Sequence, residues 1–424
     1  MTYRAPARRV SGMTRWGRAW IAILTMGAGS CAVYAADAPS GSPSGSDAPV
    51  TAYGNVRYRI ETVDQEGIAR DAFASTLRAR LGVRTREWQG FSAVLEGEAS
   101  SRIGDEHYND TINGLTQYPV VADPKNVSVY QASLRWHWGD RFEVNAGRRA
   151  INLDNQRWVG SVDWRQNGQT LDGAGVEFKP LPGMTVSYNH IWRVNRIYGR
   201  DSMQGAYTGN RIHLLRLSQE FKGAGALVVY DYMLDIPDAP ASSSRTLGAR
   251  FSGAHGLGAG KLKLLYTLEY ARQSDYGRNP RDFNLGYLLI EPGVAYGPLS
   301  IKAGYERLGG NGTVGLQTPL ATLHAFNGWA DKFLTTPATG LRDVYGDVTW
   351  KLGGPGLLKD TTLRAAWHDY RADHGSQRDG SEWDFMVSHP IGTHFTALVK
   401  YATYERDRFA TDTDKFWTSI EAKF

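Results

Sequence analysis

Apolar and polar residues alternate along most of this chain. Beyond the N-terminal region the dominant period is two, which is the period of a β-strand with one apolar and one polar face. In the first such segment, apolar residues alternate with Arg57, Arg59 and Glu61. The segment 130–138 repeats the pattern, with Tyr130 on its apolar face. The pattern predicts an antiparallel β-protein.

The links between the alternating segments indicate the kind of sheet, because short and long links follow each other along the chain. The short links lie at 87–90, 139–141, 180–183, 222–225, 254–260, 297–299, 352–360 and 390–392. The long links lie at 62–74, 103–126, 150–171, 193–210, 235–245, 273–284, 308–340, 372–381 and 405–414. This rhythm is typical of a transmembrane barrel with tight periplasmic turns and long extracellular loops. The predicted fold is all-β, an antiparallel up-and-down barrel of about eighteen strands.

A sheet in hydrocarbon must close on itself, because the bilayer offers no partners for its edge groups. At about eighteen strands, a closed barrel leaves a water-filled lumen. The last segment, 415–424, is long enough for a tilted spanning strand and ends at Phe424. A terminal Phe resembles the signal that outer-membrane proteins present to the barrel-assembly machinery. We therefore expect an integral protein of the outer membrane of a Gram-negative bacterium, with that machinery, membrane lipid and lipopolysaccharide as partners.

The N-terminus is predicted to be an export signal. Five arginines precede an apolar stretch and a small-residue cleavage site, so residues 1–35 are interpreted as a Sec-type signal peptide. Residues 36–52 are rich in Pro, Gly and Ser and are expected to be a flexible segment, which leaves 53–424 for the barrel. The one cysteine, Cys31, lies in the signal, whose five positive charges also account for the net charge of +5. The mature chain is thus neutral, and nothing in its charge indicates a nucleic-acid partner.

Aromatic residues make up 12% of the chain, and many of them stand near predicted strand ends. Such residues form girdles at the two membrane interfaces of a barrel. The residues expected there are Trp136, Trp138, Trp192, Tyr296, Trp350, Trp367 and Trp417. The alternative is that some of them pack within loops.

The polar face of the first strands is strongly basic. If the apolar face contacts lipid, the predicted lumen residues include Arg57, Arg59, Arg78, Arg80, Arg84, Arg135, Arg149, Glu96 and Glu98. Ladders of basic residues favour anions in a pore, and arginine forks bind carboxylates through two hydrogen bonds. These residues form a candidate anion pathway. In the alternative interpretation, inward charges pair across the lumen merely to stay hydrated and neutral.

Two long motifs resemble the alginate export family of outer-membrane proteins. The first is GRRAINLDNQRWVG at 147–160, followed by WRQN at 164–167 and by Asp172. The second runs from TPL at 318–320 to HAFNGWADKF at 324–333. The resemblance extends over the predicted barrel. It implies an eighteen-stranded, monomeric barrel in a family whose founding member exports the polyuronate alginate through an electropositive pore.

Both motifs fall in long predicted loops, where a rigid barrel can position functional residues. The motif residues of interest are Asp154, Asn155, Arg157, Trp164, Arg165, Gln166, Trp329, Asp331 and Lys332. Those expected to hold the third loop inward as a constriction are Asp154, Arg157, Trp164 and Arg165, with Arg149 at its base. The alternative is that they knit the loops to the wall through a pair between Asp154 and Arg157 or Arg165. For the three residues of the second motif, a structural role is favoured.

The function indicated first is a passive outer-membrane channel for anionic solutes, above all the export of acidic, alginate-like oligo- or polysaccharide. The alternative is an uptake porin for small organic acids or sugars, since lumen charge does not give a direction. An enzyme is not expected, because the chain has no G-x-S-x-G motif and no helix-spaced pair of histidines. A soluble carbohydrate-binding sandwich would lack the terminal Phe and the rhythm of the links. No cofactor and no metal is expected.

Overall fold

The alternating segments form nineteen strands of one sheet in the computed structural model, which describes residues 48–258 and 261–424. The strands are β1 (Val50–Gln65), β2 (Ala72–Thr85), β3 (Phe91–Arg102), β4 (Asn126–Trp138), β5 (Phe142–Arg149), β6 (Thr170–Phe178), β7 (Met184–Asn195), β8 (Ala206–Tyr207), β9 (Arg211–Phe221), β10 (Gly225–Asp235), β11 (Ser244–Gly256), β12 (Leu262–Asp275), β13 (Asn284–Tyr296), β14 (Leu299–Leu308), β15 (Leu341–Lys351), β16 (Thr362–Arg371), β17 (Arg378–Ile391), β18 (Phe395–Arg406) and β19 (Thr413–Lys423). Two short 3-10 helices, η1 (Pro240–Ser242) and η2 (Leu323–Ala325), lie in loops.

The predicted signal peptide and most of the flexible segment, residues 36–47, lie outside the described residues. The first strand begins slightly before the expected start of the barrel, at Val50. In the described part of the chain, no helix is long and apolar enough to cross a membrane.

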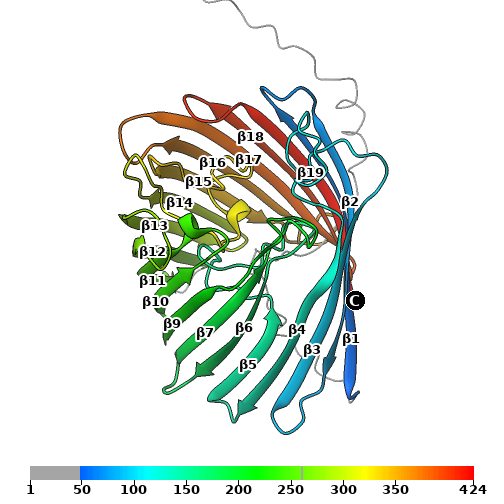
Figure 1. The fold of residues 1–424 in the computed structure, drawn as a ribbon, viewed down its shortest axis with the longest axis vertical. Coiled ribbons are helices and arrows are strands. Elements are labelled where there is room, and N and C mark those ends of the chain that lie inside the picture. The colour runs from blue at the N-terminus through cyan, green and yellow to red at the C-terminus, as the bar shows by residue number, and fades with distance from the viewer. Residues whose placement is uncertain (1–47, 259–260) are drawn as a thin grey trace, which may run out of the picture.

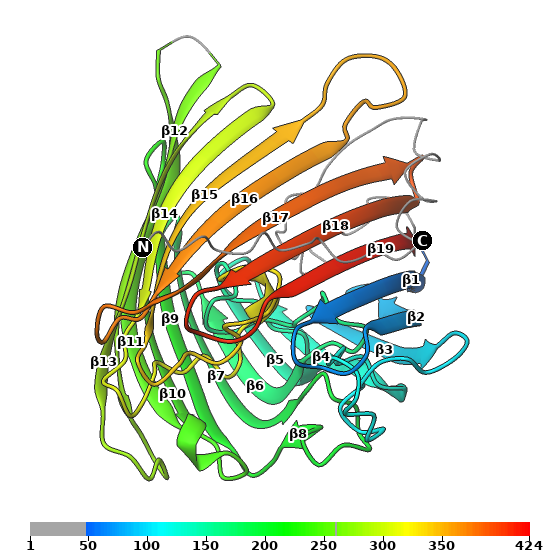
Figure 2. The same cartoon turned by 90° about the horizontal axis from the view of Figure 1, so that it is seen from above.

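The sheet closes into a barrel, as Figures 1 and 2 show. Each long strand pairs antiparallel with its neighbours, and β1 closes the ring by pairing with both β2 and β19. The C-terminal residue is part of this seam, because the backbone N–H of Gly54 donates to the carbonyl oxygen of Phe424 over 2.8 Å. The two-residue β8 pairs with β7 alone. Eighteen strands therefore form the wall, and the predicted fold class and strand number are confirmed.

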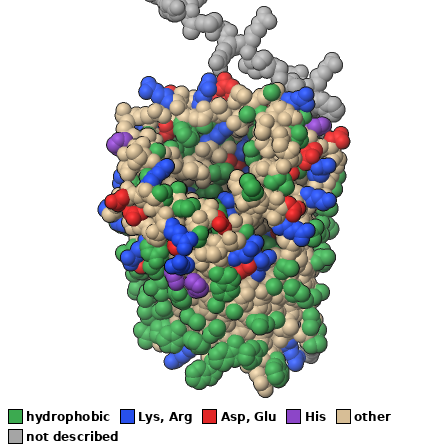
Figure 3. Space-filling model, in the orientation of Figure 1, with side chains coloured by type: hydrophobic (Ala, Val, Ile, Leu, Met, Phe, Trp, Pro, Cys, Tyr) green, Lys and Arg blue, Asp and Glu red, His purple; other side chains and the backbone are tan. Residues whose placement is uncertain are grey.

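The outer wall carries a band of exposed apolar side chains, which covers the lower half of the face in Figure 3. Leu134 and Leu268 are more than half exposed in this band, and Trp138 and Tyr296 stand near its edge. A wall that is apolar outside and polar inside is what a bilayer requires. The structure is thus that of an integral outer-membrane barrel.

Two aromatic residues lie on the opposite side from the one expected. Trp417 is fully buried. Side chains alternate along β19, so Phe416 points outward and Trp417 faces the lumen. Tyr130 was assigned to the lipid face, but a β-bulge interrupts the pairing of β3 with β4, where Glu96 pairs with Gln131 and Gly97 with Val129. Tyr130 is the extra residue of this bulge. It faces inward beneath the guanidinium of Arg80, 3.7 Å from its ring centre.

A charge placed on the lipid face of a mid-strand residue tests this assignment of the wall. We expect Leu268→Arg, in the middle of β12, to lower the free energy of unfolding in vesicles by about 2–4 kcal/mol. Leu262→Arg, at the short-turn end of the same face, is the matched control and should cost at most about 1 kcal/mol. Urea titration of the barrel in lipid vesicles measures both values. Equal costs for the two variants would contradict the placement of β12 across the bilayer.

Candidate functional site: two loops folded into the lumen

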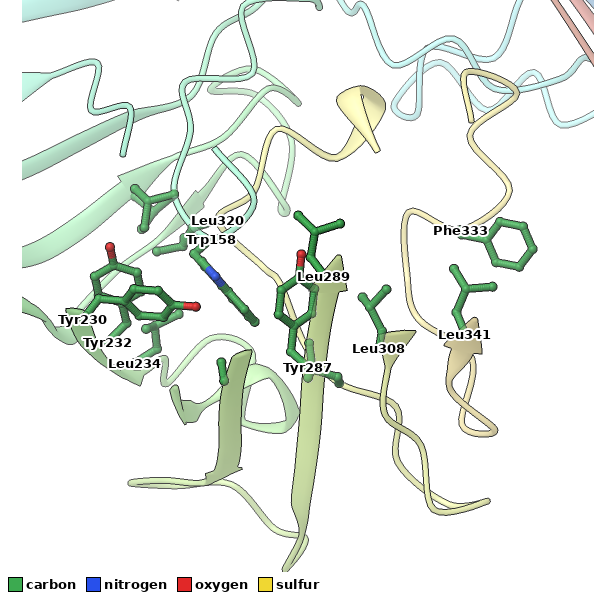
Figure 4. Close-up of a cluster of buried hydrophobic side chains, with 14 of the residues drawn as sticks. Trp158, Tyr230, Tyr232, Leu234, Tyr287, Leu289, Leu308, Leu320, Phe333 and Leu341 are labelled. Carbon is green, nitrogen blue, oxygen red and sulfur yellow. The ribbon is translucent and has the colours of Figure 1, made fainter. Parts of the chain in front are cut away.

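Two of the long loops fold into the lumen instead of extending from the rim (Figure 2). They are the β5–β6 loop, residues 150–169, and the β14–β15 loop, residues 309–340. Their apolar side chains pack on the inner wall of β10 to β15, as Figure 4 shows. Trp158 lies between Tyr230 and Tyr287, at ring distances of 6.0 and 5.1 Å, and donates its indole N–H to Glu269 over 2.7 Å. The inward position of the β5–β6 loop therefore rests on an aromatic anchor as well as on polar contacts.

The two inner loops are joined to each other. The backbone N–H of Gly160 donates to the carbonyl oxygen of Leu320 over 2.9 Å. The side-chain amide of Gln169 donates to the same oxygen over 3.0 Å, and the hydroxyl of Thr322 donates to Gln156 Oε1 over 2.6 Å. Because these bonds cross between segments far apart in the sequence, the two loops form a single partition of the lumen.

The basic ladder of β1 and β2 faces inward, as expected, but it lies under the β5–β6 loop. Arg57 is 6% exposed and Arg59 is 1% exposed. Arg57 donates to the carbonyl oxygens of Asp163, Trp164 and Arg165, the last over 2.6 Å. Arg59 donates to the carbonyl oxygen of Trp164 over 2.5 Å. Arg78 of β2 also donates to the carbonyl oxygens of Asp163 and Arg165. The arginines of the first two strands thus satisfy backbone carbonyls of the loop, so they act as anchors.

Arg78 and Arg80 hold the same loop through its carboxylate. Both contact Asp163, Arg78 over 2.9 Å, and Arg80 also donates to Glu98 over 2.6 Å. Glu98 in turn accepts the backbone N–H of Gly168. Four of the predicted lumen arginines and one glutamate are thus engaged by the loop, and a role for them in a solute pathway stays a prediction.

The remaining predicted lumen residues are placed as follows. Arg84 is half-buried over the ring of Tyr53 at 4.8 Å, and Glu96 accepts hydrogen bonds from Tyr53 and Gln131. Arg135 lies 3.7 Å from Glu143. Arg149 donates to Asn189 over 3.0 Å. Their side chains point to the lumen. They line the wall beside the partition and are not held by it.

Arg157 and Arg165 of the first motif form buried ion pairs with other segments. Arg165 lies 3.2 Å from Glu61 of β1 and 3.1 Å from Asp331 of the β14–β15 loop. Arg157 lies 2.9 Å from Glu306 of β14. Each arginine therefore ties a loop to the wall, and Arg165 also ties the two loops together.

The pair proposed between Asp154 and an arginine of its own loop does not form. Asp154 instead binds Arg216 of β9 over 2.7 Å, so it joins the loop to the wall. Asn155 accepts the backbone N–H of Arg157 over 3.3 Å and shapes the turn. Gln166 accepts from Arg57 over 3.1 Å and donates to Thr76 of β2.

A cage of rings and charges occupies the junction of the two loops. Lys400 of β18 lies 4.0 Å from the ring of Trp164 and 3.6 Å from that of Trp329, and its ammonium donates to His324 over 2.8 Å. Trp164 stacks on His324 at 4.5 Å, and Trp417 packs edge-on against both rings. Alternation along β18 indicates that Lys400 faces inward, but the roles of His324 and Trp417 depend on tertiary contacts that no local pattern encodes.

The charges at this junction keep Asp331 ionised and His324 neutral. Burial alone would raise the pKa of Asp331, but Lys415, His324 and Arg165 outweigh it and hold the pKa well below its usual value. Burial lowers the pKa of His324, and the charge of Lys400 lowers it further. Burial beside Lys415 likewise lowers the pKa of Lys332 to about 8. These contacts hold Asp331 and Lys332 of the second motif at the junction, and a structural role for the motif stays a prediction.

Four ion pairs of the lumen wall have the base as the more exposed partner, whereas in the pairs that Arg78 forms with Asp163 and Glu421 the acid is the more exposed. The side-chain exposures are 20% and 12% for Arg216 and Asp154, 13% and 1% for Arg250 and Glu269, 37% and 18% for Lys302 and Glu291, and 33% and 10% for Arg364 and Asp347. Water in the lumen therefore meets the basic end of each of these pairs. Across residues 48–258 and 261–424, no cluster of three or more His, Cys, Asp or Glu side chains is arranged to hold a metal ion.

Removing the side chain of Arg165 tests whether the loops form a fixed constriction. Arg165→Ala leaves Glu61 and Asp331 buried without this partner, and breaking such a buried pair costs about 3–5 kcal/mol. We expect a loosened partition, with higher single-channel conductance and more open-channel noise, in a barrel that still folds. Arg200→Ala, at a 72% exposed loop arginine, is the control. Unchanged channel properties in Arg165→Ala would contradict the constriction.

Acid should release the same contact. Since the pKa of Asp331 is depressed in the folded protein, its stabilising effect is complete above about pH 4, where an unfolded Asp titrates, and is lost as the pH falls below that. We expect constant open-channel noise between about pH 5 and 7 and rising noise below about pH 4. Asp331→Asn should be noisy already at neutral pH. A wild-type channel that stays quiet at the acidic end would show that Asp331 does not hold the loop.

Comparison with known proteins extends these observations. No model of a known protein family and no curated protein matches the chain. Among solved structures, OccK9 (OpdG) of Pseudomonas aeruginosa is similar with a TM-score of 0.69 at 14% identity, covering 88% of this chain and 98% of that one. The outer membrane protein OpdK of the same organism gives 0.68 at 12% identity, covering 88% and 99%. OccAB4 of Acinetobacter baumannii gives 0.68 at 12% identity, covering 89% and 99%.

These comparisons correct the family assigned from the motifs. The resemblance to the alginate export family is wrong, because the similar barrels are Occ and Opd porins. The two motifs hold the inner loops to each other and to the wall, which is a structural task that does not depend on a polyuronate cargo. At 12–14% identity the likeness establishes the fold, which is that of an outer-membrane porin barrel.

Proposed function

We propose that this protein is a passive outer-membrane porin that takes up small organic acids. The observation that carries the proposal is a set of four lumen ion pairs in which the basic partner is more exposed to water than the acid. Four pairs on β9, β11, β14 and β16 share this polarity. A solute that follows the wall meets guanidinium and ammonium groups first, and these groups attract carboxylates.

The partition supports a small solute. Both inner loops are tied by buried ion pairs and by hydrogen bonds to each other, so a wide polymer would have to break several of these contacts to pass. Each buried pair that is broken costs about 3–5 kcal/mol, which opposes such a displacement. A partition held in place in this way favours uptake of small molecules over export of a polysaccharide.

A known ligand of a similar barrel supports an acid. One structure of OpdK, with a TM-score of 0.68 to this chain, contains vanillate, a small aromatic carboxylate. Identity between the two chains is 12%, so the contacts of that ligand are not transferred. The chemistry of such a ligand nevertheless matches the exposed bases of this lumen.

Ion selectivity and solute uptake test the proposal. The refolded mature barrel should be anion-selective in a planar bilayer under a salt gradient, and vesicles that contain it should admit benzoate faster than glucose and exclude oligouronate. The double variant Arg216→Gln/Arg364→Gln should lower the anion-to-cation permeability ratio about threefold, the effect of about 0.6 kcal/mol expected for exposed charges.

The matched control is Arg245→Gln, because Arg245 is an exposed arginine of an ion pair with Asp231 on the outer face of the wall. This variant should leave selectivity unchanged. A cation-selective wild-type channel would contradict the proposal. Equal rates for benzoate and glucose would contradict a preference for acids.

A further inference from the structure

A row of arginines crosses the outer surface near the long-loop end of the barrel. The arginine row consists of Arg272 on β12, Arg307 on β14, Arg342 on β15, Arg371 on β16 and Arg378 on β17. Arg307 stands directly opposite Arg342, Arg342 opposite Arg371, and Arg371 opposite Arg378. Like charges directly opposite each other destabilise a sheet. A row of this kind calls for an anion.

The row extends across the one intervening strand. Arg272 pairs with Gly286 of β13, and Arg307 Nη1 comes within 3.8 Å of the place where Gly286 would carry a Cβ. The missing side chain of Gly286 leaves the space between Arg272 and Arg307 open. The five guanidinium groups therefore follow one continuous strip of the wall.

The side chains of the row point away from the lumen. Their chain neighbours Glu306, Asp343 and Tyr370 are at most 3% exposed and face inward. The arginines of β14 to β17 have exposed side-chain fractions between 33% and 57%. Strand alternation thus separates the row from the solute path, and the two sets of charges act independently.

Three carboxylates contact the row, and two of them lie beneath it. Asp373 accepts two bonds from Arg307, over 2.6 and 2.9 Å, and Asp369 bridges Arg371 and Arg378 over 3.0 and 2.7 Å. These two carboxylates are only 7% and 13% exposed. Asp407 is exposed and lies 3.9 Å from Arg378. These three acids face five arginines, which leaves positive charge in excess on the surface.

Donors remain available on this strip. Among the described residues, neither Nη atom of Arg371 has a hydrogen-bond partner, and Arg272 has no acceptor for its guanidinium. Arg342 is used differently, because it donates to the carbonyl oxygen of Ala372 and orders the β16–β17 loop. The strip therefore has guanidinium N–H donors on a fixed backbone that are free to bind an anion.

The row lies at the upper edge of the apolar band. Below Arg342, the outward positions of β15 are Val344, Gly346, Val348 and Trp350. That span measures about 27 Å along the strand at ~3.4 Å per residue, or about 20 Å across a bilayer at the usual tilt. Below Arg371, the outward indole of Trp367 stands opposite that of Trp383. An apolar band of this height sets the arginines at the headgroups of the outer leaflet.

We propose that the arginine row binds the phosphate groups of lipopolysaccharide in the outer leaflet. Guanidinium forks match phosphate oxygens through two parallel hydrogen bonds, and basic residues at a membrane surface attract anionic lipid. The acyl chains of the same molecule lie against the apolar wall below the row, beside Trp367 and Trp383. One lipopolysaccharide molecule would thus place its phosphates on the arginine row and its acyl chains on the apolar wall below.

The test measures binding of lipopolysaccharide to the detergent-solubilised mature barrel by native mass spectrometry. We expect the wild type to bind lipopolysaccharide with phosphorylated lipid A at least tenfold more tightly than the dephosphorylated form. Arg371→Gln/Arg378→Gln should remove that preference and leave channel conductance unchanged. Arg102→Gln, at an arginine of similar exposure on β3 and outside the row, is the matched control and should bind like the wild type.

Heat-dependent migration on gels shows whether each variant is folded, and the single variant Arg371→Ala replaces the double variant if that one does not fold. Equal binding of the two lipid forms by the wild type, or undiminished preference in the variant, would overturn the proposal. Variant-sensitive binding of inorganic phosphate without a preference for phosphorylated lipid would overturn it too, and would mark a site for the free ion. Lipid-free oligomers that dissociate in the double variant would assign the row to contacts between copies of the chain.

Discussion

A backbone inside hydrocarbon must find all its hydrogen-bond partners within the protein, and this constraint shapes every part of the barrel. It requires the ring that β1 closes with β19, and with it the alternation that sends one side chain to lipid and the next to water. At the depth of the hydrocarbon, polar side chains of the wall gather on the lumen side. The constraint on the outside thus determines the chemistry of the inside.

The backbone of the inner loops also needs hydrogen-bond partners within the lumen. A loop folded inward brings carbonyl groups that no strand pairs, and arginine, with five N–H donors, can satisfy several at once. Arg57 serves three successive carbonyls of the β5–β6 loop. Arg57, Arg59, Arg78 and Arg80 are thus explained by the backbone and the carboxylate of a loop, whereas the four ion pairs with the more exposed base lie elsewhere on the wall.

Much of the wall was predictable from the sequence, because strand alternation and link length are local properties. The burial of Trp417 and the inward turn of Tyr130 were not, since one depends on loops that pack against it and the other on a bulge that shifts the register by one residue. The partner of Asp154 lies on a distant strand, so spacing along the chain favoured the wrong arginine. The family resemblance failed for a related reason, because motifs that hold loops in place carry little information about cargo.

The seam between the first and last strands gains a second closure from within. Arg165 and Asp331, one from each inner loop, bind Glu61 on β1 and Lys415 on β19. The wall must be nearly complete before the loops have a surface to dock on, and docking then fastens the two ends of the polypeptide. Long-range contacts of this kind form late in folding. The two inner loops thus add buried ion pairs on both strands of the seam to the backbone hydrogen bonds that join them.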